Sequence, residues 1–265
     1  MALDIESLAL AVCDVARKAG AFIKQERAVF SPDKIERKHA HDYVSYVDKG
    51  SENIIVESLR RLLPEAGFIT EEGTAAYAHE KYCWVVDPLD GTTNFLHSYA
   101  PYAVSIALTE GEDILIGVVY EVCADECFYA WRGGGAYVNG KPIHVSNQPF
   151  ADALLCLQLP YNSDAYKPVI QRLVSELYGR VASVRMTGSA AMALCYVAAG
   201  RLDGYAEKYI GQWDYMAGAL LVAEAGGCVT DYDGNHSFTR GNSVLATNGA
   251  IQQNILEVLK GSCKS

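Results

Sequence analysis

Apolar residues recur every three or four positions at the start of the chain, which predicts an amphipathic helix there. Leu8, Val12 and Val15 fall on one side of such a helix. A second stretch with helical spacing passes through Ile54–Leu62, and Pro64 follows it. Because proline cannot continue a helix, we expect the second helix to end there.

Short runs of β-branched and aromatic residues replace this pattern between residues 67 and 131. Acidic or glycine-containing turns separate most of the runs, which is typical of successive hairpins. The expected strands are Gly67–Thr70, Tyr82–Val86, Ala103–Leu108, Ile114–Val119 and Glu126–Trp131. We expect them to form an antiparallel meander.

After Ser146 the pattern alternates between helical and β-like segments. The helical candidates are Ala165–Tyr178, Ser189–Ala199, Trp213–Ala225 and Ile251–Leu259, and the β-like runs are Val181–Val184, Cys228–Thr230 and Val244–Ala246. Such alternation predicts a layered α/β half. We therefore expect a single domain over 1–265, with an α+β half at 1–147, an α/β half at 148–265 and a site in the cleft between them.

Composition narrows the class of protein. Of the 265 residues, 50% are hydrophobic and 20% are charged, as in ordinary globular domains, and the net charge is −10. This negative charge disfavours nucleic acid and anionic membranes as partners. No run reads as membrane-spanning, and the N-terminus carries acids where a secretory signal would be basic. The eight cysteines form no CxxC pair, so we expect reduced thiols in the cytoplasm.

The most informative stretch runs from Trp84 to Phe95. An apolar run leads to Asp87, a turn is expected over the following proline and glycine, and Asp90 comes three residues after the first acid. Two carboxylates on one tight turn can both face a hard cation, and the carbonyl of Leu89 offers a third oxygen. An ordinary surface turn is the alternative, since Asp, Pro and Gly are common turn residues.

The residues after Gly91 are Thr92, Thr93 and Asn94, which favour the start of a helix. Free backbone amides at a helix N-terminus bind anions, phosphate in particular. One short loop thus combines cation ligands with an oxyanion site. Metal-assisted hydrolysis of a phosphate ester needs this combination.

Further acids lie at the ends of other predicted segments. Glu71 and Glu72 follow one β-like run, Asp48 closes the segment that begins at Asp42, and Asp214 precedes an apolar helical run. Each of them alone is also explained as a solvated charge or a helix cap. Together they supply enough carboxylates for a site of two or three cations.

The order and spacing of these motifs resemble those of the inositol monophosphatase family over nearly the whole chain. The matching motifs are Glu71-Glu72, Asp87-Pro88-Leu89-Asp90-Gly91-Thr92-Thr93-Asn94-Phe95, Gly188-Ser189-Ala190, Trp213-Asp214 and Glu224-Ala225-Gly226-Gly227. The resemblance implies a layered αβαβα sandwich, of the type shared by inositol monophosphatase and fructose-1,6-bisphosphatase. It also implies Mg²⁺ dependence, sensitivity to lithium and a homodimer.

The resemblance assigns roles to individual positions of this chain. It places Glu71, Asp87 and the Leu89 carbonyl around one Mg²⁺, and Asp87, Asp90 and Asp214 around a second, with a weaker third ion leaning on Glu71. It makes Thr92 and Asp48 the pair that orients and deprotonates the attacking water. Glu71, Asp48 and Thr92 are thus the expected catalytic group.

Substrate contacts are implied in the same way. Gly91, Thr92 and Thr93 would bind the phosphate, and the leaving group would lie against Gly188, Ser189, Ala190, Glu207 and Asp214. Lys38, upstream of Asp48, would balance phosphate charge, and Glu72 is a further candidate site residue. Glu207 otherwise reads as a charged residue at an exposed strand end.

The function expected from these residues is hydrolysis of myo-inositol 1-phosphate to myo-inositol and phosphate by a water that bound Mg²⁺ activates. Related activities remain open: fructose 1,6-bisphosphatase, histidinol phosphatase and 3′-phosphoadenosine nucleotide phosphatase. A different class of alternative is a metal-binding regulatory protein that keeps the fold without catalysis.

Overall fold

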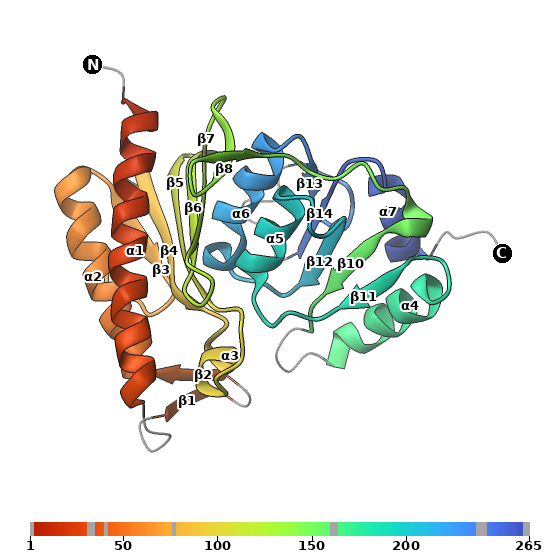
Figure 1. Cartoon of the computed structure of the whole chain (residues 1–265), viewed down its shortest axis with the longest axis horizontal. Coiled ribbons are helices and arrows are strands. Elements are labelled where there is room, and N and C mark those ends of the chain that lie inside the picture. The colour runs from red at the N-terminus through yellow and green to blue at the C-terminus, as the bar shows by residue number, and fades with distance from the viewer. Residues whose placement is uncertain are drawn as a thin grey trace.

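In the computed structural model, helices and sheets alternate across the molecule in the order helix, sheet, helix, sheet, helix (Figure 1). The structure describes residues 3–30, 35–39, 42–75, 78–159, 164–236 and 243–261, and no side chains for 35–39 and 42–44. The expected layered αβαβα sandwich is therefore confirmed.

Two long helices form the first outer layer. α1 (Ile5–Val29) and α2 (Tyr46–Leu62) pack side by side on one face of the larger sheet. Both helices were expected. Helix α2 begins eight residues earlier than the expected start at Ile54, because Ser45 provides its N-cap. Two short strands lie between α1 and α2 in the sequence, β1 (Ile35–His39) and β2 (Asp42–Ser45). They pair with each other in antiparallel orientation.

The larger sheet has seven strands in chain order. They are β3 (Gly67–Thr70), β4 (Tyr82–Asp90), β5 (Ala103–Glu110), β6 (Asp113–Glu121), β7 (Glu126–Trp131), β8 (Gly135–Val138) and β9 (Lys141–Ile143). From β4 onward the sheet is the expected antiparallel meander. The expectation is wrong for β3, which pairs parallel to β4 because the chain crosses back through the segment between them.

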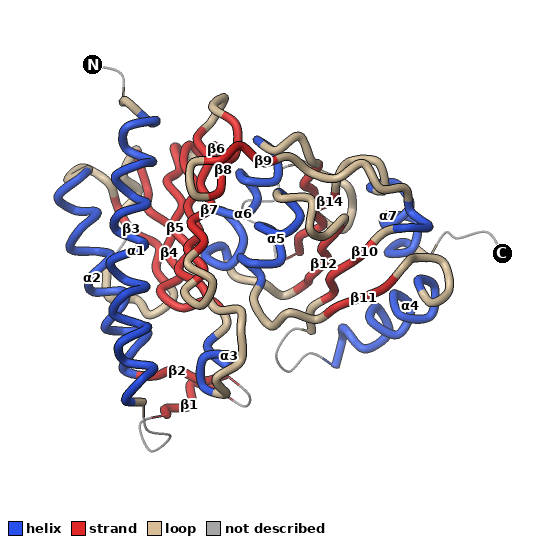
Figure 2. The backbone as a smooth tube through the Cα atoms, viewed as in Figure 1, coloured by secondary structure: helices blue, strands red, loops and turns tan. Residues whose placement is uncertain are grey.

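The central layer consists of α5 (Ala190–Ala198) and α6 (Gln212–Glu224), which lie between the two sheets (Figure 2). Small residues let these elements approach closely. A Cβ on Gly117 of β6 would lie 2.4 Å from the backbone oxygen of Ala217, and one on Gly218 would collide with Leu194. Helix α6 is therefore held tightly against the larger sheet.

The smaller sheet has five strands in the order β11-β10-β12-β14-β13. They are β10 (Leu154–Leu157), β11 (Ser183–Arg185), β12 (Gly204–Lys208), β13 (Cys228–Thr230) and β14 (Ser243–Thr247). α4 (Lys167–Leu177) and α7 (Gln252–Lys260) cover its outer face. Strands β10 and β12 were not expected from the sequence, because runs of four or five residues carry little periodicity.

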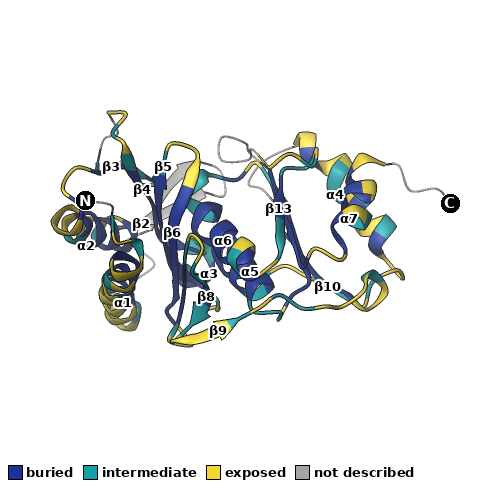
Figure 3. Ribbon diagram, turned by 90° about the horizontal axis from the view of Figure 1, so that it is seen from above, coloured by how far each residue is buried: buried dark blue, intermediate teal, exposed yellow. Residues whose placement is uncertain are grey.

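Buried residues concentrate where the layers meet, as Figure 3 shows. The short helix α3 (Thr92–Leu96) follows β4 at the edge of this core and faces the start of α5. Its N-cap, Gly91, has a φ of 87°, a left-handed conformation that glycine adopts without strain. Among the described helices, none is both long and apolar enough to cross a membrane.

Candidate active site

Three aspartates from distant parts of the chain meet beside the central layer. Asp87 and Asp90 lie at the end of β4, and Asp214 lies in the first turn of α6. Each offers a carboxylate oxygen, and these oxygens all lie within 4.8 Å of one another. The fold therefore brings the expected carboxylates together, although they are up to 127 residues apart in sequence.

A bulge in β4 directs Asp87 and Asp90 into one site. Asp87 pairs with Ser105 and Asp90 with Ala103, so three steps along β4 oppose two along β5. Side chains three residues apart on a regular strand point to opposite faces, and the extra residue corrects this. The expectation of a strand that ends before a simple turn is wrong here, since pairing continues through Asp90.

Hydrogen bonds from two helix starts hold Asp90 and Asp214. Asp90 accepts bonds from the Ser189 hydroxyl and from the amides of Ala190 and Ala191, the latter at 3.3 and 2.9 Å. Asp214 accepts from the Gly211 amide at 2.8 Å, at the first turn of α6. Both carboxylates are thus fixed by amides at helix N-termini, which favour negative charge.

The cluster concentrates negative charge in a buried place. Burial, followed by repulsion from neighbouring carboxylates, raises the pKa of Asp87 well above its usual range. Burial and the nearby Asp90 likewise raise the pKa of Asp214. In the described part of the chain, no ion pair with lysine or arginine reaches these aspartates. An all-oxygen donor set without a cationic side chain fits a hard divalent ion.

Glu71 joins the site from the end of β3. Its amide donates to the Val86 carbonyl at 3.2 Å, and its charge is among the causes that raise the pKa of Asp87. The loop after Glu71 is anchored by Glu52, a fully buried residue of α2. Glu52 accepts from the amides of Glu72 and Thr74, both at 2.8 Å. Glu52 was not expected as a site residue, although its position one helical turn after Asp48 was a usable signal.

Replacing Glu52 with glutamine is expected to weaken this anchor. One carboxylate oxygen would become an NH₂ group, so one of the two amide donors would lose its acceptor. Leaving such a buried group unpaired costs about 1–3 kcal/mol. We expect urea unfolding to show that loss and phosphate release to need more divalent ion. Glu57→Gln, an exposed change on the same helix, is the control, and equal stability of both variants would contradict the assignment.

Thr92 and Asp48 are in direct contact. The Thr92 hydroxyl lies 3.1 Å from Asp48 Oδ1 and 3.0 Å from the Leu89 carbonyl oxygen. A hydroxyl has one proton, so it donates to one of the two at a time. Asp48 is buried, and the Ser45 amide and hydroxyl donate to its other oxygen at 2.8 and 2.7 Å. Burial raises the pKa of Asp48, as suits a proton acceptor.

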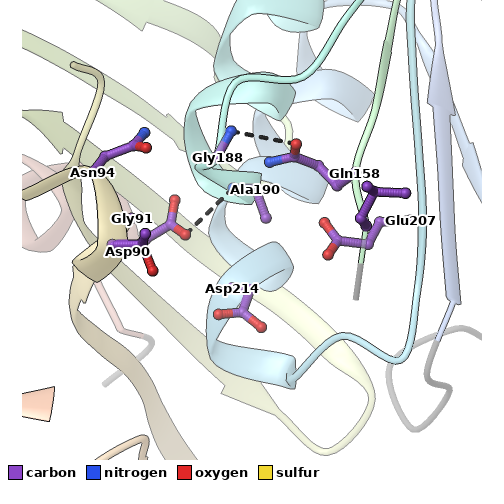
Figure 4. Close-up of a pocket in the computed structure, with 10 residues that line it drawn as sticks. Asp90, Gly91, Asn94, Gln158, Gly188, Ala190, Glu207 and Asp214 are labelled. Atoms are coloured by element: carbon purple, nitrogen blue, oxygen red, sulfur yellow. Dashed lines mark hydrogen bonds between the residues drawn. The ribbon is translucent and has the colours of Figure 1, made fainter. Parts of the chain in front are cut away.

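A cavity of about 240 Å³ opens beside the aspartates (Figure 4). Its lining comprises Asp90, Gly91, Thr93, Asn94, Gln158, Leu159, Gly188, Ala190, Glu207 and Asp214. Most of the residues expected to contact substrate thus line one space. Ser189 is instead buried and bonds Asp90, and Thr92 turns toward Asp48. The side chain of Lys38 lies outside the described residues. Glu72 is connected to this region through its backbone N–H, which donates a hydrogen bond to Glu52.

Three lining residues were missed as site residues: the polar Asn94 and Gln158, and the apolar Leu159. The Asn94 amide donates to the carbonyls of Pro101 and Thr187, both at 2.8 Å, and so joins α3 to the segment before α5. Gln158 follows the apolar run of β10 directly, as Asp87 follows an apolar run in β4. A polar residue at the end of an apolar strand was therefore the available signal.

Glu207 faces the cavity from β12. The Tyr205 hydroxyl donates to its Oε2 at 2.5 Å and fixes the carboxylate. Burial, with a smaller contribution from the charge of Asp90, raises the pKa of Glu207 to about 7. The end of the cavity opposite Asp90 therefore presents an oriented hydrogen-bonding group.

Known proteins are similar to this chain in sequence and in fold. The profile of the inositol monophosphatase family matches residues 4–263. An inositol-1-monophosphatase of Mesorhizobium japonicum is 38% identical over 247 residues, or 92% of this chain and 93% of that one. The Nus factor SuhB of Escherichia coli is 38% identical over 91% of both chains. The crystal structure of the extragenic suppressor protein suhB from Bartonella henselae has a TM-score of 0.92 and 34% identity, and the match covers 97% of this chain and 100% of that one.

Proposed function

The chain belongs to the inositol monophosphatase family, and from this premise we propose that it is a Mg²⁺-dependent phosphatase that hydrolyses myo-inositol 1-phosphate. The observation that carries the proposal is one cavity with the Asp87, Asp90 and Asp214 cluster at one side and Glu207 at another. Inositol 1-phosphate needs both environments, since its phosphoryl group is anionic and its leaving group is a polyol.

We assign the metal ligands to the residues that the site holds together. Asp87, Asp90 and Asp214 would bind a divalent ion through their carboxylates, and Glu71 and the Leu89 carbonyl would contribute to a neighbouring one. These donors suffice for two ions, and a third, more weakly bound ion would be coordinated by Glu71 and waters. Bound Mg²⁺ supplies Lewis-acid polarisation of the phosphoryl oxygens and lowers the pKa of water.

The chain's own groups position the reactants and move the proton. Thr92 Oγ1 accepts a hydrogen bond from the attacking water while it donates its own proton toward Asp48 Oδ1. Asp48 then takes up the proton, which its raised pKa favours. Gly91 and Thr93 contact the phosphate at the start of α3, and Glu207 binds leaving-group hydroxyls on the opposite side.

A panel of phosphate esters tests this proposal directly. Phosphate release in the presence of Mg²⁺ is measured from inositol 1-phosphate, fructose 1,6-bisphosphate, histidinol phosphate and 3′-phosphoadenosine 5′-phosphate. We expect inositol 1-phosphate to give the highest kcat/KM, because Glu207 suits a ring that carries hydroxyls. A much higher kcat/KM on another ester would overturn the substrate assignment.

A regulatory role is the second candidate function. One relative at 38% identity is named a Nus factor, which is not the name of an enzyme. Retention of the acidic cluster and of the Thr92–Asp48 contact favours catalysis in this chain. If no ester of the panel released phosphate with Mg²⁺ present, the regulatory candidate would replace the enzymatic one.

Family membership also supplies the remaining parts of the proposal. We extend to this chain inhibition by lithium, assembly as a homodimer and a place in the cytoplasm. We likewise propose that the halves expected at 1–147 and 148–265 correspond to the two sheets, with the cavity between them. Each of these remains a prediction for solution measurements.

A further inference from the structure

Gln158 occupies a place in the cavity that the proposed mechanism leaves unused. It follows β10 directly, and its backbone amide donates to the Ala206 carbonyl at 3.3 Å, which continues the parallel pairing of β10 with β12. Leu157 pairs with Ala206, so the next residues in register are Gln158 and Glu207. Residues at matching positions of paired strands face the same side of a sheet. The backbone therefore aims both side chains into one space, as Figure 4 shows.

The two side chains present complementary groups to that space. Gln158 Oε1 accepts from the Gly188 amide at 3.3 Å, which leaves the Nε2 donors free of any hydrogen bond to the described residues. Glu207 Oε2 is taken by the Tyr205 hydroxyl, which leaves Oε1 as an acceptor. Although Gln158 is only 7% exposed, it lines the cavity. Gln158 Nε2 is not among the fully buried unpartnered atoms of the described residues, so it is open to the cavity, where a ligand hydroxyl can accept from it.

A donor beside an acceptor suits a hydroxyl, because an alcohol both accepts and donates a hydrogen bond. We propose that Gln158 is a specificity-determining residue whose Nε2 donates to a leaving-group hydroxyl that Glu207 also contacts. Selectivity for a polyol ester over an unsubstituted ring then depends on both side chains. This inference rests on the proposed function, since it concerns the leaving group of the same reaction.

Gln158 also has a positioning effect through Gly188, and one substitution separates the two roles. Gln158→Glu keeps an Oε1 acceptor for the Gly188 amide but replaces the Nε2 donor with an oxygen. Gln158→Met removes both groups. Gln148→Glu, the same change at an exposed position away from the cavity lining, is the matched control.

The test compares kcat/KM for inositol 1-phosphate with kcat/KM for cyclohexyl phosphate, a ring ester without hydroxyls, using the full chain with Mg²⁺. We expect Gln158→Glu and Gln158→Met to lower the ratio of the two values about 10- to 100-fold, mainly through the KM for inositol 1-phosphate. The added negative charge of glutamate acts on the phosphate of both esters, but it also acts on Glu207, which contacts inositol 1-phosphate alone. Gln158→Met adds no charge, so the role of Gln158 requires the ratio to fall in both variants. Gln148→Glu should keep the ratio of the unchanged protein.

The outcomes separate this inference from the proposed function. An unchanged ratio in both variants, or a loss shared equally by both esters, would overturn the role of Gln158 while the phosphatase assignment stands. A ratio that falls in Gln158→Met but not in Gln158→Glu would assign the effect to the Gly188 contact and overturn the inference as well. No phosphate release from either ester by the unchanged protein would overturn the proposed function itself.

Discussion

Replacing Asp90 with asparagine is expected to abolish Mg²⁺-dependent phosphate release while the protein remains folded. Asp90 belongs to the carboxylate cluster, and an amide is a much weaker ligand for a hard cation. Metal assistance is worth several kcal/mol of transition-state stabilisation, and each 1.4 kcal/mol is a factor of ten in rate. We therefore expect kcat/KM to fall by about 10³-fold or more, measured as free phosphate.

The fold of this variant should survive because Ser189 is the N-cap of α5 and its side chain still accepts from the Met192 amide at 3.2 Å. The Oδ1 of asparagine can still accept from the Ser189 hydroxyl and the Ala191 amide, so only the 3.3 Å bond from the Ala190 amide is lost. Loss of one charge also relieves repulsion with Asp87 and Asp214. The metal-free Tm should therefore stay near that of the unchanged protein. Asp14→Asn, an exposed change on α1, is the control, and near-normal turnover by Asp90→Asn would refute the assigned role.

Asp48→Asn is expected to lower kcat by about 10²- to 10⁴-fold, the usual range for loss of a general base. Asparagine can still accept from the Ser45 amide, so the start of α2 should persist. It cannot take the proton that Thr92 passes on. Because Asp48 is outside the carboxylate cluster, the affinity for divalent ion should change little. The measurements are single-turnover phosphate release and a metal titration of the same sample.

A control for helix capping accompanies this variant. Asp4 caps α1 through its contact with the Ser7 amide at 3.1 Å, far from the cavity, so Asp4→Asn should leave kcat unchanged. If Asp48→Asn retained more than about a tenth of the normal kcat, or if it lost metal binding as well, Asp48 would not be the base.

Local patterns in the sequence were sufficient for most elements. The exact bounds of β3, β7 and β13 follow from β-branched and aromatic runs between turn residues. Helix α1 follows from its regular apolar spacing. The strands that were missed are short and are defined by their pairing partners rather than by their own three to five residues: β1, β2, β8, β9, β10 and β12.

The sequence indicated that Asp87, Asp90 and Asp214 belong to one cluster, but not the geometry that brings them together. The motif around Asp87 and Asp90 pointed to paired carboxylates, yet the bulge that directs both to one side depends on pairing with β5. Glu52 and Gln158 were missed because their roles arise from contacts with Thr74 and Gly188, which are distant in the sequence. Tertiary contacts of this kind leave only weak local signals.

The central claim is that carboxylates from β4 and α6 together hold a divalent ion. Calorimetric titration of Mg²⁺ into metal-stripped protein, and into Asp214→Asn prepared in the same way, tests it most directly. We predict binding to the unchanged protein and an affinity at least about tenfold lower in the variant, because Asp214 supplies one of the clustered oxygens. Equal affinity in both proteins, or no binding to the unchanged one, would contradict the account.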